Sequence, residues 1–238
     1  DDNSIRIINS NLDLLKSIQD FTLVSPFELG LNEPFPVGIR VNPKNKHLVL
    51  NGKIGHLQFF STKSMRLLFN VDITARNAMP RQEKCNNFST EVTLVAFSSC
   101  GTWMATVEDW NNKIHSTESR LKFWKFTNEK QTYFLHTQIE QAHEKSISCL
   151  EFSYENDLPL CATVGSDRII RIWSLEASEE IKNPKKIWMH IEQLSYKNLP
   201  VHSMSFSRDS SLLAAGFGNS LCVWDTVSFK LKCALSAP

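Results

Sequence analysis

A histidine, a threonine, an aspartate and a tryptophan share one short stretch, and their side chains could form a polar network: His143, Thr163, Asp167 and Trp173. A hydroxyl, an imidazole and a carboxylate are also the parts of a nucleophilic triad. A triad is recognised by its geometry, and this hydroxyl is expected to point into packed β-structure rather than into a cleft. Because a buried carboxylate is costly unless it accepts hydrogen bonds, we interpret the four residues as structural and expect no catalytic residue.

Three short strand-like runs position this network. They cover residues 147–152, 160–164 and 169–173, and an Asn-Asp pair and a Gly-Ser-Asp turn separate them. Runs of this length, rich in β-branched and aromatic residues, predict an antiparallel meander. Asp167 then lies in the tight turn between the second and third strands.

Length and charge exclude several classes of protein. The chain has 238 residues and a net charge of +1, with a pI of about 7.8. This charge balance provides no overall attraction to nucleic acid or to anionic lipid. No apolar run approaches the roughly 18 residues that span a membrane, and the first residues, DDNSIRII, do not resemble a signal peptide.

Neither the cysteines nor the histidines show metal-ligand spacing. The six cysteines, at positions 85, 100, 149, 161, 222 and 233, contain no Cys-x-x-Cys pair. Three of them fall on expected strands, so free buried thiols in a reducing compartment are favoured over zinc ligands or disulfides. We therefore expect no metal, no cofactor and no small-molecule substrate.

Weaker copies of the same four-stranded unit account for the rest of the chain. Period-2 alternation dominates, and full units are expected at residues 37–73, 91–137, 143–190 and 201–235. Residues 1–24 supply only the third and fourth strands of such a unit. Residues 25–36 hold three prolines and are expected to form a linker. The predicted fold is all-β, with four units in residues 37–238.

The spacing of His143, Thr163, Asp167 and Trp173 resembles the WD repeat, the four-stranded blade of a β-propeller. The resemblance implies four full blades plus a half blade, as part of a larger, tandem propeller protein. The other three blades lack the complete set of four residues. Since the ring cannot close as written, three alternatives remain: a fragment of a longer protein, which we favour, completion by a partner, or a half blade that ends a preceding propeller.

The connection at residues 108–120 is expected to be a swollen turn and a candidate contact surface, because loops often carry function. Decoration that packs on its own blade is the interpretation favoured over a contact surface. An aromatic anchor would be Trp110, and the candidate partner residues are Trp110, Asn111, Asn112 and Lys113. A second polar loop, at residues 74–90, is longer than usual connections.

Two expected loops carry lysines that could contact a phosphate backbone without reading bases. Lys44 and Lys46 share one loop, and Lys182, Lys185 and Lys186 lie in the other, at residues 176–186. The alternatives are a solvated loop, which short basic clusters usually form, or a weak nuclear address.

Longer stretches resemble the WD repeat-containing protein 75 family: NPKNKHLVLNGKIGHLQFF, FSSCGTWMATVEDWNNKIHSTESRLKFWKF and CATVGSDRIIRIWSLE. The resemblance implies a non-catalytic scaffold in the nucleus and nucleolus, within the small-subunit processome. It implies roles in ribosome biogenesis, in rRNA processing and in support of RNA polymerase I transcription. Implied partners are other WD-repeat processome subunits and pre-rRNA, with no membrane. No binding residue of the family transfers to this sequence.

Two other classes of function compete with this scaffold. A propeller adaptor, such as a ubiquitin-ligase substrate receptor, should present Arg, Tyr or Trp around the centre of a complete ring, and the sequence shows no such set. An enzyme needs convergent ionisable residues or metal ligands, and the scattered histidines provide none.

Overall fold

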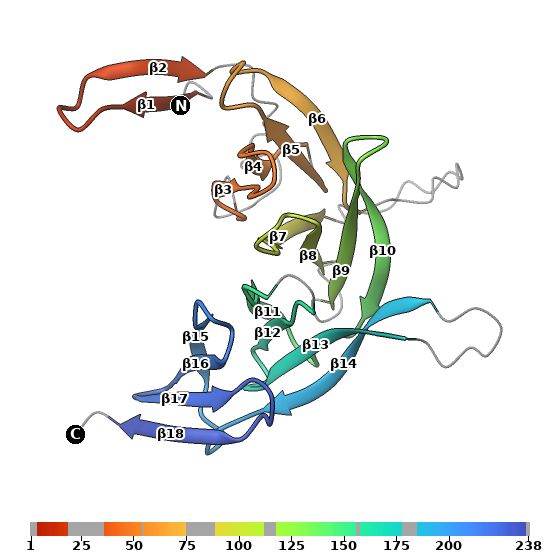
Figure 1. Ribbon diagram of the computed structural model, residues 1–238, viewed down its shortest axis with the longest axis vertical. Helices are drawn as coiled ribbons and strands as arrows, with labels where there is room; N and C mark the ends of the chain where they lie inside the picture. The colour runs from red at the N-terminus through yellow and green to blue at the C-terminus, as the bar shows by residue number, and fades with distance from the viewer. Residues whose placement is uncertain are drawn as a thin grey trace.

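The computed structural model describes residues 4–18, 36–53, 55–74, 89–111, 118–155, 158–177 and 185–236. The regular secondary structure within these ranges consists of β-strands alone. The strands form four four-stranded antiparallel sheets and one two-stranded sheet. The four-stranded sheets follow one another around an arc, with the first strand of each on the concave side (Figure 1). The predicted all-β propeller fold is confirmed.

Each four-stranded sheet is one blade of a simple meander. The first blade contains β3 (Arg40–Val41), β4 (Leu48–Asn51), β5 (His56–Phe60) and β6 (Leu67–Asp72). The second contains β7 (Ser89–Phe97), β8 (Trp103–Asn111), β9 (Glu118–Thr127) and β10 (Thr132–Glu140). The third contains β11 (Ile147–Phe152), β12 (Cys161–Gly165), β13 (Ile170–Ala177) and β14 (Lys186–Leu194). The fourth contains β15 (Val201–Phe206), β16 (Leu212–Phe217), β17 (Ser220–Asp225) and β18 (Leu231–Ser236).

Two connections that we expected to be loops are partly strand. In the second blade Glu108 pairs with Arg120 and Trp110 with Glu118, so only residues 112–117 separate β8 from β9. The expectation of a swollen turn at residues 108–120 is therefore wrong at both ends. Polar residues are depleted in strands, but here they pair across the sheet, and Arg120 lies 3.8 Å from the Glu108 carboxylate. In the third blade the expected loop at residues 176–186 shortens in the same way.

The hydrophobic core lies between the blades rather than within one sheet. Separate clusters fill the seams between the first and second, second and third, and third and fourth blades. In the second seam the Trp188 ring stacks on Phe123 at a centroid distance of 4.3 Å and meets Trp103 edge-on at 5.4 Å. Burying large aromatic surface in this way stabilises neighbouring blades.

The N-terminal residues form a hairpin of β1 (Ile5–Ile8) and β2 (Leu14–Ile18). Ile7 packs beside the pair Leu50 and Phe60, so the hairpin lies against the first blade. Leu12 lies in the turn between the two strands, with φ of 66°. Most of the expected linker and of the loop at residues 74–90 lies outside the described residues.

Candidate functional site

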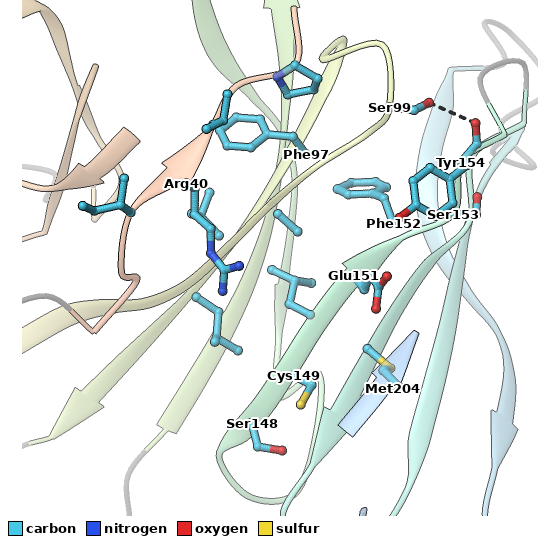
Figure 2. Close-up of a pocket in the computed structure, with 17 residues that line it drawn as sticks. Arg40, Phe97, Ser99, Ser148, Cys149, Glu151, Phe152, Ser153, Tyr154 and Met204 are labelled. Carbon is cyan, nitrogen blue, oxygen red and sulfur yellow. Dashed lines mark hydrogen bonds between the residues drawn. The ribbon is translucent and has the colours of Figure 1, made fainter. Parts of the chain in front are cut away.

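A groove of about 880 Å³ runs along the concave side of the arc. Strands β3, β7 and β11 provide its walls, and Met204 of β15 lies at one end (Figure 2). Most lining side chains are apolar, and the two charged residues of the lining are Arg40 and Glu151. Sequence patterns did not reveal this groove, because its shape depends on how three blades sit beside one another.

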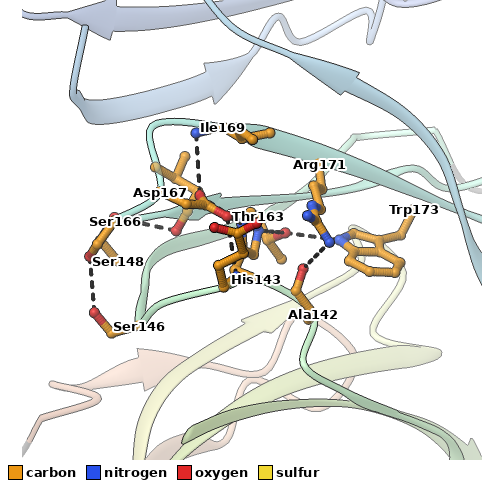
Figure 3. Close-up of polar contacts among 12 residues, drawn as sticks. Ala142, His143, Ser146, Ser148, Thr163, Ser166, Asp167, Ile169, Arg171 and Trp173 are labelled. Atoms are coloured by element: carbon orange, nitrogen blue, oxygen red, sulfur yellow. Dashed lines mark hydrogen bonds and ion pairs between the residues drawn. The ribbon is translucent and has the colours of Figure 1, made fainter. Parts of the chain in front are cut away.

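The third blade contains the polar network that the sequence suggested, shown in Figure 3. His143 Nε2 lies 2.8 Å from Thr163 Oγ1, and His143 Nδ1 lies 3.1 Å from the Asp167 carboxylate. The Trp173 indole donates to the same threonine oxygen at 2.9 Å. The structure thus joins all four residues by hydrogen bonds. These bonds link the loop before β11 to β12, to the turn after β12 and to β13.

Gly165 makes space for this network. A Cβ atom at this position would clash with His143 Nδ1 and with Asp167 Oδ1. The Asp167 carboxylate also accepts the backbone N–H groups of Ile169 and Glu144, each at 3.3 Å. The short turn therefore holds its carboxylate from several sides, as a buried anion requires.

Burial lowers the pKa of His143, although the neighbouring Asp167 opposes this shift. The neutral imidazole can donate from Nδ1 to Asp167 and accept the Thr163 hydroxyl proton at Nε2. That is the polarity of a nucleophilic triad. Thr163 is fully buried, however, and its oxygen already accepts the Trp173 indole. No substrate can reach this hydroxyl, so the arrangement is structural.

A second network fills the corresponding positions of the second blade. Trp124 donates its indole N–H to Thr106 at 2.9 Å. Beside this pair, Lys122 Nζ lies 2.9 Å from the Glu108 carboxylate and donates to the Ile73 carbonyl at 2.6 Å. Lys122 and Glu108 are each 1% exposed, and burial raises the pKa of Glu108, which the adjacent ammonium opposes.

Sequence reasoning missed this pair because it placed Glu108 in a loop. A signal was available: the run ATVED followed by LKFW has the same order as ATVGS followed by IRIW in the third blade. Lys122 then corresponds to Arg171, which donates to the Ala142 carbonyl at 2.9 Å. Both cations bind the chain just after the outer strand of the preceding blade.

Asn51 was also missed, because Asn51-Gly52 resembles a simple hairpin turn. Its side chain is buried and joins the first two blades. It donates to the Glu91 carboxylate and to the Val92 carbonyl, each at 2.9 Å, and accepts the Val37 N–H at 3.0 Å. Burial raises the pKa of Glu91 to about 7.

The candidate contact residues are not gathered in one place. Trp110 and Asn111 end β8, whereas Asn112 and Lys113 lie outside the described residues. Lys44 and Lys46 lie in the β3–β4 turn, where the Lys44 ammonium is 4.7 Å from the centre of the Phe126 ring.

The second group of lysines belongs to the third blade, with the second blade between (Figure 1). Lys186 begins β14 and pairs with Ala177, so its expected loop position is wrong. Lys185 precedes that strand, and Lys182 lies outside the described residues.

Other features limit the chemistry of the described part of the chain. Its residues contain no cluster of three or more histidine, cysteine or acidic side chains suited to a metal ion. Cys161 and Cys222 are buried free thiols within strands. No helix long and apolar enough to cross a membrane occurs among the residues described.

Comparison with known proteins identifies the family. Residues 39–238 match the family model of the WD repeat-containing protein 75 second beta-propeller. The chain is 33% identical over 237 residues to the human (Homo sapiens) WD repeat-containing protein 75, covering 98% of this chain and 27% of that protein.

Two further relatives agree with this result. The Mus musculus protein of the same name is 34% identical over 239 residues, with the same coverage. The Xenopus laevis protein is 30% identical over 243 residues, covering 100% of this chain and 28% of that protein. The chain thus spans little more than a quarter of the length of these relatives. WD-repeat propellers are typically non-catalytic. The chain belongs to the WD repeat-containing protein 75 family, and its residues 39–238 match the second β-propeller of that family.

Proposed function

We propose that this chain is a non-catalytic scaffold subunit in ribosome biogenesis, acting in the nucleolus. Its roles would be assembly of the small-subunit processome, pre-rRNA processing and support of RNA polymerase I transcription. The observation that carries the proposal is family membership over residues 39–238. The buried Thr163 hydroxyl supports it too, because the one triad-like set of the described residues has no access to substrate.

Partner proteins are proposed to bind the tip of the second blade. In the second blade β8 continues to Asn111 and β9 begins at Glu118, so both strands extend beyond the usual length of a blade strand. Trp110, Asn111, Asn112 and Lys113 are the proposed contacts with other WD-repeat subunits. Residues 1–24 are proposed to end a preceding propeller, in keeping with the start of the family match at residue 39.

Direct contact with pre-rRNA is proposed through the backbone of the RNA. In each antiparallel blade, the turns that join the first strand to the second and the third strand to the fourth lie at the same end. The described residues of these turns hold eight cations, at Lys44, Lys46, Lys63, Arg66, Lys130, Lys185, Arg208 and Lys230. They hold only three carboxylates, at Glu129, Glu155 and Asp209. An excess of cations on one face favours phosphate over any particular base.

Affinity purification of the protein with its natural termini from nuclear extract tests the scaffold proposal. Recovery of processome subunits together with pre-rRNA is expected. Recovery of a ubiquitin ligase or a signalling complex in their place would contradict the proposal and favour the adaptor alternative.

The salt dependence of RNA binding tests the contact separately. Reversing Lys44 and Lys46 to glutamate removes two phosphate contacts, so the slope of log affinity against log salt should fall by about 1.4 for single-stranded leader RNA. The matched control reverses Lys53 in the β4–β5 turn and Lys145 in the connection before β11, both at the opposite end of the blades. Binding that does not depend on salt, or an equal loss in the control, would contradict backbone contact.

A further inference from the structure

The groove on the concave side is bordered by strand edges that have no described partner. In each blade the innermost strand is the end strand of its sheet, so among the described residues β3, β7 and β11 are paired on one side only. The free edge of such a strand presents N–H and C=O groups that no neighbouring strand of the sheet pairs. An extended polypeptide satisfies these groups when it lies along an edge.

Apolar side chains cover much of the groove and are accessible to a ligand. Ile39 is 57% exposed, Val41 is 53% exposed and Tyr154 is 49% exposed, and all three line the groove. Phe97 and Met204 are partly buried beside them. A ligand with small apolar side chains would remove this surface from water, which favours binding.

Two opposite charges stand on facing walls of the groove. Figure 2 shows the Arg40 guanidinium on the β3 side of the groove and the Glu151 carboxylate on the β11 side, turned towards Met204 of β15. Arg40 Nε donates to the Val37 carbonyl at 3.3 Å, and Glu151 accepts the Ser205 hydroxyl at 3.0 Å. Within the described ranges the ion pairs involve neither Arg40 nor Glu151. Burial also raises the pKa of Glu151, so a nearby cation would relieve an existing cost.

We propose that the groove binds an extended segment of a partner protein, with an acidic side chain against Arg40, a basic side chain against Glu151 and small apolar side chains between them. Backbone groups of the strand edges are available to the segment where it crosses from β3 past β7 to β11, and the two charges fix its direction. This binding goes beyond a scaffold that contacts its partners through blade tips and turns. The proposal does not depend on the RNA contact, because none of the eight cations of the turns lines the groove.

Nucleic acid fits the same groove less well. Among the described residues only one cation, Arg40, lines it, and the Glu151 carboxylate would repel a phosphate backbone. A segment of alternating charge matches both walls, whereas a polyanion matches one.

Selection of peptides tests the proposal even though the partner protein is unidentified. The probe is a phage-displayed library of random linear peptides, selected on the full-length protein that contains this chain. The expected peptides carry one acidic and one basic residue that flank apolar residues. Their affinity is then measured by fluorescence anisotropy against charge-reversed variants of the protein.

Each charge reversal should act on its own position of the peptide. Arg40→Glu and Glu151→Lys should each weaken binding by about tenfold or more, since like charges then face each other. A peptide with its two charges exchanged should bind the double variant and not the natural protein. Glu151→Gln keeps an acceptor for Ser205 and should weaken binding less, which separates charge from folding.

Matched controls and contrary outcomes are available on the same chain. Lys53→Glu in the β4–β5 turn and Glu140→Lys on β10 change charge by the same amounts outside the groove, and should leave affinity unchanged. The proposal fails if no peptide is selected, or if both groove reversals leave affinity unchanged in variants with natural thermal unfolding. It also fails if poly-uridine RNA binds this groove and Glu151→Lys strengthens that binding.

Discussion

The second and third blades hold different chemistry at the same positions of the sheet. In each, the second strand carries a threonine that accepts a tryptophan indole, Thr106 in one blade and Thr163 in the other. Two residues later the blades differ, because the second has Glu108 and the third has Gly165. The carboxylate of Glu108 pairs with Lys122 of the neighbouring strand, whereas Gly165 leaves room for a histidine from the preceding loop.

The difference shows that one buried polar position can be filled from two directions. In the second blade the filling groups stand on adjacent strands of the same sheet. In the third blade they come from a loop and a turn, so they also fix the entry of the chain. The fourth blade has Ala215, Phe217 and Cys222 at these positions, all in the apolar seam. Blade shape therefore does not require the polar groups, which instead connect neighbouring segments.

Removal of one partner of the buried ion pair should have the largest effect. Glu108→Ala leaves the Lys122 ammonium buried without its carboxylate, and a loss of about 3–5 kcal/mol in the free energy of unfolding is expected. The double variant Glu108→Leu with Lys122→Met should recover most of that loss, because apolar replacement of a whole pair is often neutral. Urea unfolding measures both, and a single variant within about 1 kcal/mol of the natural protein would contradict a buried charge pair.

A methyl group at Gly165 should be the next most damaging change. Its Cβ clashes with His143 and Asp167, so Gly165→Ala should cost about 1–3 kcal/mol. His143→Ala alone should cost a similar amount, about 1–3 kcal/mol, because it leaves its partners unpaired. In the combined variant the methyl group gains space, and the two costs should not add.

Gly52 is the matched control for this variant. It occupies the corresponding position of the first blade, where a Cβ would meet Gln58 at 3.4 Å, an ordinary contact. Gly52→Ala should therefore change stability by less than about 0.5 kcal/mol. Equal effects at Gly52 and Gly165 would show that the polar network does not explain the glycine.

The two threonines should respond unequally to the same substitution. Thr106→Val leaves one indole N–H unpaired, whereas Thr163→Val leaves both an indole and the His143 imidazole unpaired. Each unpaired buried group costs about 1–3 kcal/mol, so the loss at Thr163 should exceed the loss at Thr106. Thermal unfolding of the two variants measures the difference. Equal losses would mean that the hydrogen bond between His143 and Thr163 does not contribute to stability.

The pH dependence of stability should have opposite signs at two places. His143 has a lowered pKa in the folded state. At a pH below the usual histidine pKa of about 6.5, this imidazole therefore binds more protons in the unfolded chain than in the folded one. Stability should then fall as the pH drops through that value. Glu91 has a raised pKa of about 7, so the folded state binds more protons, and stability should fall as the pH rises through the region below 7.

Neutral replacements separate these two contributions. His143→Gln should remove the loss of stability on the acid side of pH 6.5. Glu91→Gln keeps an acceptor for Asn51 and should be more stable than the natural protein above pH 7. Urea unfolding at several pH values checks both, and a Glu91→Gln variant that is less stable above pH 7 would contradict the assigned direction.

Local patterns in the sequence predicted the strands and the third-blade network, but not the contacts between blades. His143, Thr163, Asp167 and Trp173 were found because a short meander fixes their positions relative to one another. Lys122 was missed because its partner Glu108 lies in a polar stretch that resembles a loop.

Contacts between blades leave no local pattern of this kind. Asn51 was missed because its hydrogen bond to Glu91 joins two different blades. The two residues are 40 positions apart in the sequence. The groove between Arg40 and Glu151 depends on the placement of several blades, which short-range patterns do not specify.

The most direct test of the proposed function measures pre-rRNA in cells depleted of the protein. Northern analysis of precursors that retain the 5′ external leader should show accumulation after depletion, and the natural protein should restore normal levels. Glu108→Ala, which disrupts a blade, should fail to restore them, and Gly52→Ala should succeed. Normal leader processing in fully depleted cells would contradict a scaffold role in ribosome biogenesis.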